Sequence, residues 1–209
     1  MIHPLEKRLL YASLEDLLTG LINTARADPP AAMARIQMDL NQGLPAGTIS
    51  SSPKPQLRRD PRLDTAAQLY TAEILRQGIL SHELNGTPTT RANAQGYLAV
   101  TILENAGVTL SGFVHSDPAS VLKRQHDAYL AHAGHRYQEF HPGVTNLGLD
   151  AAVGSFQDHP ALVSVIVFAS PATRPPPRLF YRFGASNPST ELERIDGYVS
   201  GNLADHREQ

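Results

Sequence analysis

Leu162-Val-Ser-Val-Ile-Val-Phe-Ala169 is the stretch that decides the fold of this 209-residue sequence. Every residue in it but one is apolar, and successive side chains of a strand point to opposite faces. A strand that is apolar on both faces needs cover on both. The stretch therefore predicts the central strand of a sheet that lies between two layers of helices.

Two further strands are expected beside it. Residues 144–153 mix apolar and β-branched side chains, and the polar run at 154–160 is expected to be the turn that joins them to the central strand. Residues 98–103 have the same character and lead into Glu104. The sequence thus predicts a small sheet of about three strands, and the Gly-, Pro- and Ser-rich residues 43–59 predict a surface loop.

Helix starts follow one repeated signal, a capping side chain before a proline at the first helical position. It occurs at Asp28-Pro29, Asp60-Pro61, Thr87-Pro88 and Asp117-Pro118. Another helix is expected to begin after Ser13. Glycines predict the ends of the four proline-started helices, at Gly43, Gly78, Gly96 and Gly134 in chain order. Helices combined with a small sheet indicate an α+β protein, a three-layer α-β-α sandwich.

The composition excludes several classes of protein. There is no cysteine, hence no disulfide framework or thiolate metal site, and a net charge of −2 without a basic stripe argues against a nucleic-acid partner. No run approaches the ~20 apolar residues of a membrane helix, and no signal peptide opens the chain. A chain of this length buries roughly 70% of its unfolded surface, so folding needs no cofactor.

We expect two regions along the chain. Residues 1–170 form the domain, and residues 171–209 form a proline-rich linker and a C-terminal extension, because four prolines fall between Pro171 and Pro177. Within the extension, residues 178–183 alternate like an edge strand.

Three residues at the edges of predicted elements could form a functional site: His82, Glu104 and His135. Two imidazoles and a carboxylate suffice for a metal site or an acid/base pair. Ser81 precedes His82, but neighbours on an extended segment point apart, and no Gly-x-Ser-x-Gly elbow occurs. A serine hydrolase is therefore disfavoured.

The order of motifs resembles the CAP superfamily (cysteine-rich secretory, antigen-five and pathogenesis-related proteins), in its bacterial members, over roughly residues 14–170. The matching segments are Leu21-Ile-Asn-Thr-Ala-Arg-Ala-Asp-Pro29, Asp60-Pro-Arg-Leu-Asp-Thr-Ala-Ala67, Leu80-Ser-His-Glu83 with Gly86-Thr-Pro88, Arg91 and Gly96-Tyr97, Glu104-Asn105, Tyr129-Leu-Ala-His-Ala-Gly-His-Arg136 and Thr145-Asn-Leu-Gly-Leu149. The resemblance implies a sandwich with a mainly antiparallel sheet and a cleft in which the three site residues face one another. Three positions depart from the family pattern: Leu103 replaces a glycine, Tyr129 a tryptophan and His132 a glutamate.

Under this resemblance His82 and His135 are the candidate ligands of a divalent metal, zinc first. Glu104 is the candidate general base, or else it orients an imidazole. Support for the cleft is expected from His132, Arg136, Asn105 and Ser81.

Three functions are open at this point. The first is a secreted binding module whose polar cleft holds a metal or small ligand and which takes a small-molecule, lipid or protein partner without catalysis. The second is a metal-dependent, peptidase-like hydrolase, and the third a lipid or sterol carrier. An apolar groove would favour the carrier, and a deep polar pocket with three ligands the hydrolase. The sequence does not determine the oligomeric state.

Overall fold

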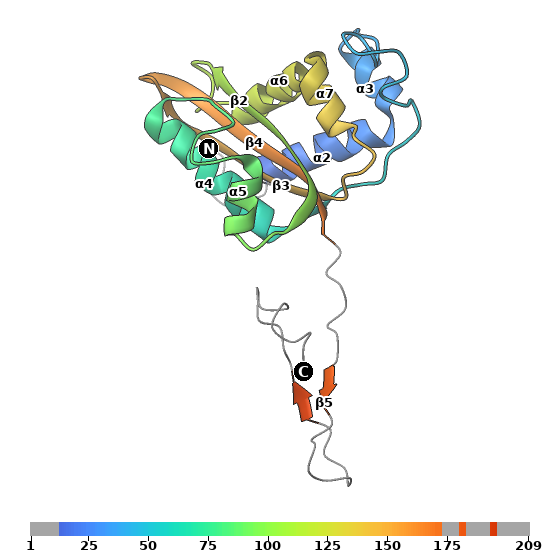
Figure 1. The fold of residues 1–209 in the computed structure, drawn as a ribbon. Helices are drawn as coiled ribbons and strands as arrows, with labels where there is room; N and C mark the ends of the chain where they lie inside the picture. The colour runs from blue at the N-terminus through green and yellow to red at the C-terminus, as the bar shows by residue number, and fades with distance from the viewer. Residues whose placement is uncertain (1–12, 173–179, 183–192, 196–209) are drawn as a thin grey trace, which may run out of the picture. The chain divides into compact units, whose positions relative to one another are not determined.

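The computed structural model describes residues 13–172, 180–182 and 193–195 (Figure 1). Contacts divide the chain into two compact units, Met1–Ala172 and Thr173–Gln209. In the second unit, β5 (Phe180–Arg182) pairs antiparallel with β6 (Glu193–Ile195). The elements of the first unit are α2 (Leu14–Ala27), α3 (Pro29–Arg35), β1 (Arg58–Arg59), α4 (Pro61–Gln77), α5 (Pro88–Ala94), β2 (Ala99–Leu110), α6 (Pro118–Ala131), α7 (Ala133–Glu139), β3 (Asn146–Phe156) and β4 (His159–Pro171).

Strand β4 lies inside the sheet, as its apolar sequence predicts. The strand order is β1-β3-β4-β2, with β2 and β3 both antiparallel to β4 and β1 parallel to β3. Leu162, Ile166 and Phe168 of β4 belong to one buried cluster. Val163 and Val165 belong to the other. The central strand therefore contributes alternate side chains to two cores.

Helices cover both faces of this sheet (Figure 1). Helices α2 and α6 pack on one face through Leu18, Ile22 and Leu122. Helices α4 and α5 pack on the other through Tyr70 and Ala92. The α+β class and the three-layer sandwich are thus confirmed. Among the described residues, every helix is too short or too polar to cross a membrane.

The predicted helix starts are confirmed by their capping bonds. At each start the capping side chain accepts a hydrogen bond from a backbone N–H of the first turn, which would otherwise lack a partner. The capping residues are Ser13, Asp28, Asp60, Thr87 and Asp117. At the other end of α4, Gly78 takes the left-handed conformation that ends the helix.

Two helix ends differ from the predictions. Helix α3 ends at Arg35, well before Gly43, because Gln37 has a left-handed φ of 57° that a helix cannot continue through. Helix α6 ends at Ala131 instead of Gly134. There His132 takes an extended conformation, its side chain accepts the N–H of His135, and a separate helix, α7, begins.

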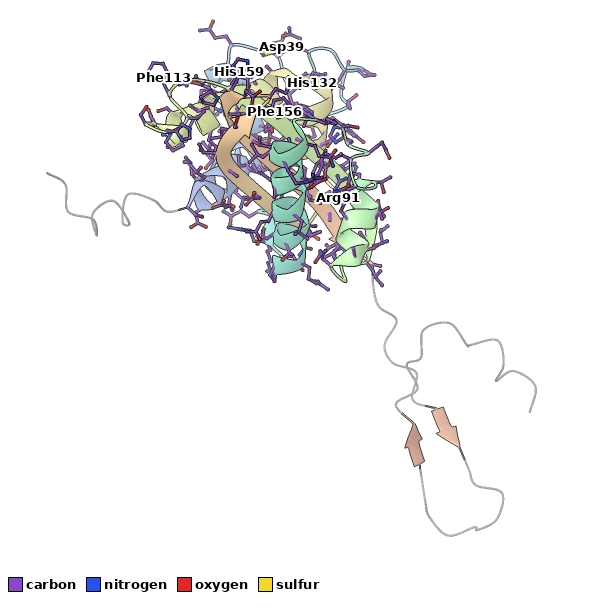
Figure 2. The ribbon with its side chains drawn as sticks, turned by 90° about the vertical axis from the view of Figure 1, so that its left-hand side faces the viewer. Asp39, Arg91, Phe113, His132, Phe156 and His159 are labelled. Atoms are coloured by element: carbon purple, nitrogen blue, oxygen red, sulfur yellow. The ribbon has the colours of Figure 1, made fainter. Side chains whose placement is uncertain are left out.

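The strands also exceed their predicted lengths. Strand β2 continues to Leu110, and a two-residue strand, β1, adds to the expected three. The turn predicted at 154–160 is shorter, because Phe156 and His159 face each other across the hairpin (Figure 2). Only Gln157 and Asp158 form the turn, both with positive φ, as such a two-residue hairpin requires.

Candidate functional site

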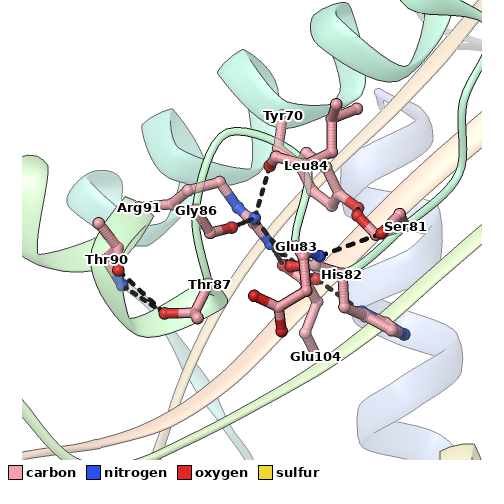
Figure 3. A network of polar contacts seen from close by, with 10 residues as sticks. All are labelled: Tyr70, Ser81, His82, Glu83, Leu84, Gly86, Thr87, Thr90, Arg91 and Glu104. Carbon is pink, nitrogen blue, oxygen red and sulfur yellow. Dashed lines mark hydrogen bonds and ion pairs between the residues drawn. The ribbon is translucent and has the colours of Figure 1, made fainter.

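The centre of the candidate site is the Glu104 carboxylate on β2 (Figure 3). Its Oε1 lies 2.9 Å from Nδ1 of His82, which follows α4 in a turn. Nη2 of Arg91, on α5, lies 2.8 Å from Oε1 and 2.6 Å from Oε2. The Glu104 side chain is 2% exposed and the His82 side chain 52%. A buried carboxylate thus holds a solvent-facing imidazole by one ring nitrogen and leaves Nε2 free to bind a ligand.

Arg91 also fixes the segment that carries His82. Its Nη1 donates to the backbone carbonyls of His82 (3.1 Å), Leu84 (2.9 Å) and Gly86. The guanidinium lies over the ring of Tyr70, 3.8 Å from the centroid. Tyr70 in turn donates its hydroxyl to the carbonyl of Ser81 at 2.6 Å. Both ends of the turn are therefore fastened to α4 and α5.

Sequence reasoning missed Arg91 and Tyr70 as parts of the site. Arg91 stands in one of the family-like motifs and Tyr70 on the apolar face of α4. A buried glutamate in a strand is the one signal that could have led to Arg91, because a buried carboxylate requires a cation or several donors.

The second imidazole comes from the other face of the sheet. Nδ2 of Asn105 donates to the backbone carbonyl of His135 at 3.2 Å. The ring of His135 meets the ring of Tyr129 edge-on, with centroids 5.1 Å apart. His132 lies beside it, with centroids 4.6 Å apart. These contacts hold the start of α7 against β2.

Glu104 and Asn105 of β2 anchor the two segments that carry the imidazoles, the His82 turn and helix α7. Successive residues of a strand point to opposite faces, so Glu104 binds the His82 turn on the α4–α5 face and Asn105 binds α7 on the α6–α7 face. Strand β4 closes one side of β2, and the other side is the sheet edge. The His82 turn and the start of α7 therefore lie on opposite faces of β2, and the charge of His82 affects the pKa of His135.

The two imidazoles have opposite electrostatic surroundings. The hydrogen bond to Glu104 raises the pKa of His82, against the effect of burial. Burial, together with the charges of His132 and His82, lowers the pKa of His135 to about 4. At neutral pH His135 is uncharged and keeps a lone pair for a metal or a hydrogen-bond donor.

The predicted supporting residues have different roles. Arg136 is fully buried and caps carbonyls: it donates to Leu40 (2.9 Å) and Leu130 (2.8 Å), and also to Gln42. It ties the loop after α3 to the end of α6. Ser81 is exposed, and its hydroxyl accepts the N–H of Glu83 at 3.3 Å in the turn.

His82 and His135 are the two imidazoles of the candidate site that could serve as metal ligands. Within residues 13–172 and the two short strands beyond, no three His, Asp or Glu side chains form a group that could hold a metal ion. Glu104 is occupied by Arg91 and His82, so the remaining ligands would be water or a bound partner. The bond from His82 to a carboxylate is the arrangement that zinc-binding histidines favour.

A separate groove of about 890 Å³ lies between α2, α3 and α6, away from the histidines. Its lining is largely apolar, with Leu17, Leu21, Ala32 and Ala119 among the residues. The charged residues that line it are Asp16, Asp28, Arg35 and Lys123.

Comparisons with known proteins give structural neighbours. No protein-family model and no curated protein matches the sequence. The extracellular SCP-domain protein of Bacillus anthracis str. Ames is 21% identical over 56% of this chain, with a TM-score of 0.42, and the match spans 34% of its own length, about a third. An outer surface protein of Borrelia burgdorferi is 16% identical, with 69% of this chain and 96% of that one covered and a TM-score of 0.43. BmVAL-1 is 11% identical, with 76% and 79% covered and a TM-score of 0.49.

Proposed function

We propose that this chain is a secreted, CAP-type binding module whose histidine cleft holds a divalent metal or a small ligand. The observation that supports this most is the Glu104–His82 pair, in which a buried, neutralised carboxylate orients a solvent-facing imidazole. Export is inferred from the motif resemblance, and fractionation of the source organism tests it: native protein in the cytosol would overturn it.

In the proposed site, Nε2 of His82 and the ring of His135 would hold the metal, and zinc suits this donor set best. Glu104 would fix the tautomer and orientation of His82. A bound metal would supply a Lewis acid with open positions for an oxygen or nitrogen atom of the partner. Asn105 and Tyr129 would keep His135 in place.

A metal-dependent hydrolase is supported less well. A general base needs a carboxylate oxygen free to take a proton from water, whereas Arg91 binds both oxygens of Glu104 and His82 binds one. The assignment of Glu104 as base stays a prediction. Peptidase assays on metal-loaded protein, with Glu104→Gln as control, test it.

Elemental analysis and zinc titration calorimetry of untagged protein test the metal proposal. We expect about one equivalent of zinc in the wild type and none in His82→Ala or His135→Ala. His159→Ala is the matched control, because His159 is exposed at the β3–β4 hairpin. Folded His82→Ala and His135→Ala proteins that keep wild-type zinc affinity would overturn the proposal.

The groove between α2, α3 and α6 favours lipid carriage as a second candidate function. Its volume and apolar lining suit an acyl chain. Gly20 lines it, and nothing lies within 4 Å of a Cβ built there, so Gly20→Phe would occupy the groove without a clash. We expect this variant to lose binding of a fluorescent fatty acid. Gly112→Phe, also in open space, should keep it, and equal binding by both variants would contradict lipid carriage.

A further inference from the structure

We propose that Leu98 and the first residues of β2, residues 98–103 in all, form a docking edge for an uncharged, extended peptide segment of a protein partner, which would add to the sheet as a fifth strand. This surface lies next to the histidine cleft but does not depend on a metal.

The edge of β2 has free backbone groups. Strand β2 is the last strand of the sheet, and β4 is its only neighbour among the described strands. Among the described residues outside β4, none forms a hydrogen bond with the backbone of residues 99–110, and the carbonyl of Leu98 accepts the N–H of Ala172 at 2.9 Å. In an antiparallel pair, alternate residues direct their N–H and C=O groups away from the partner strand. These groups are the pairing template that strand addition uses.

The edge lacks the features that keep sheet edges apart. Natural edge strands are short, or carry proline or charged residues such as lysine. Strand β1, at the opposite edge, follows this rule with only Arg58 and Arg59. Residues 98–103 (LAVTIL) contain no charge, proline or glycine. Leu98 is 61% exposed and Val100 75%. A bare edge of this kind promotes aggregation, so we infer that a partner covers it.

The charges of β2 define the partner. Its one charged residue is Glu104, which is buried and neutralised by Arg91. A charged strand laid on residues 98–103 would lose hydration, and β2 itself offers no exposed opposite charge in return. An uncharged, β-branched segment has no charged side chain to dehydrate, and it packs beside Leu98 and Val100. The complementary occupant is therefore neutral and apolar.

Val100 provides a way to close the edge selectively. It is the residue at the irregularity between Ala99 and Thr101, and it has no partner on β4. Proline is tolerated at bulges and edges, and it removes an N–H group. Val100→Pro should therefore block strand addition and leave the β2–β4 ladder intact, whereas Val100→Thr keeps the N–H and serves as the matched control.

The probe is a capped seven-residue peptide of alternating threonine and valine, with a fluorophore. We expect saturable binding to the wild type and to Val100→Thr, at least about tenfold weaker binding to Val100→Pro, and a similar loss for a peptide with alternate amides N-methylated. A peptide with lysine in place of two valines should also bind weakly. Hydrogen exchange should slow in residues 99–110 when the peptide binds.

Two binding results would overturn the inference: no peptide binding to the wild type, or peptide binding that N-methylation does not weaken. Sedimentation that shows a dimer which Val100→Pro dissociates would also overturn it, because a second copy of the chain would then be the occupant. If Val100→Pro does not fold, Val100→Lys replaces it, because the side chain at this position is exposed. Zinc content of the same variants keeps the test separate from the metal proposal. A variant that loses peptide binding but keeps its zinc tests the docking edge alone. Loss of zinc in His82→Ala tests the metal proposal alone.

Discussion

Nη2 of Arg91 lies 2.8 Å from Oε1 and 2.6 Å from Oε2 of Glu104, between helix α5 and strand β2. The pair is nearly excluded from solvent, with side chains 9% and 2% exposed. Because the arginine binds both oxygens of the carboxylate, Glu104 can stay buried and orient His82.

Removing the arginine should therefore destabilise the fold strongly. We expect Arg91→Ala to lower the free energy of unfolding by about 3–5 kcal/mol, since it leaves a buried charge without its partner. Urea unfolding measures this. Arg76→Ala is the control: Arg76 pairs with Glu73 but is 68% exposed, so its loss should have little effect on the free energy of unfolding. Equal effects of the two variants would contradict the role given to Arg91.

Neutralising Glu104 should weaken metal binding without removing a ligand. We expect Glu104→Gln to lower zinc affinity by roughly 10- to 100-fold, because the carboxylate raises the basicity of His82 and fixes its ring. Calorimetry measures the change and circular dichroism checks the fold. Glu83→Gln, at an exposed neighbouring position, should bind zinc like the wild type. Unchanged affinity in a folded Glu104→Gln protein would refute the orienting role.

A glycine in β3 should be irreplaceable. A Cβ at Gly148 would lie 2.1 Å from Cβ of Leu63, so α4 would have to move away from the sheet. We expect Gly148→Ala to cost at least about 1–3 kcal/mol, the typical range for overpacking. By contrast, Gly20→Ala, in open space within α2, should stabilise by roughly 0.5–1 kcal/mol. Thermal unfolding of both variants measures this. A Gly148→Ala protein that melts no lower than the wild type would contradict the close packing of α4 on β3.

Asp150 on β3 should make stability depend on pH. Burial raises its pKa above the ordinary 3.8, and the charges of Glu15 and Asp64 raise it further against the opposing effect of Arg59. A carboxyl whose folded pKa exceeds its unfolded pKa loses stability as the pH rises through the folded value. We expect Asp150→Asn to melt a few degrees higher than the wild type at pH 7.

That advantage should vanish when the pH falls below about 3.8, where the carboxyl is protonated in both folded and unfolded protein. Melting curves of the two proteins between about pH 3 and pH 8 check this. A constant difference across the range would mean that the gain has another cause.

Much of the fold could be predicted because its signals are local. Asp60 and Asp117 cap helices through bonds that span two or three residues, so the chain around them suffices. The central place of β4 also follows from its own residues, since a strand that is apolar on both faces must be covered on both.

Other features had no local signal. Gln157 and Asp158 form a tight turn in left-handed conformations that glycine usually adopts, so the polar run around them was predicted to be a longer loop. His132 ends one helix and caps the next, whereas Gly134, two residues on, carried the expected stop signal.

The sequence by itself determined the α-β-α architecture, the helix starts and the three candidate residues His82, Glu104 and His135. Only the tertiary structure decided their surroundings: Arg91 neutralises Glu104, and Glu104 and Asn105 hold the His82 turn and α7 on opposite faces of β2. The physical reason is distance along the chain. Capping bonds and apolar patterns act within a few residues, whereas the ion pairs and the pKa shifts of this site depend on side chains that only packing brings together.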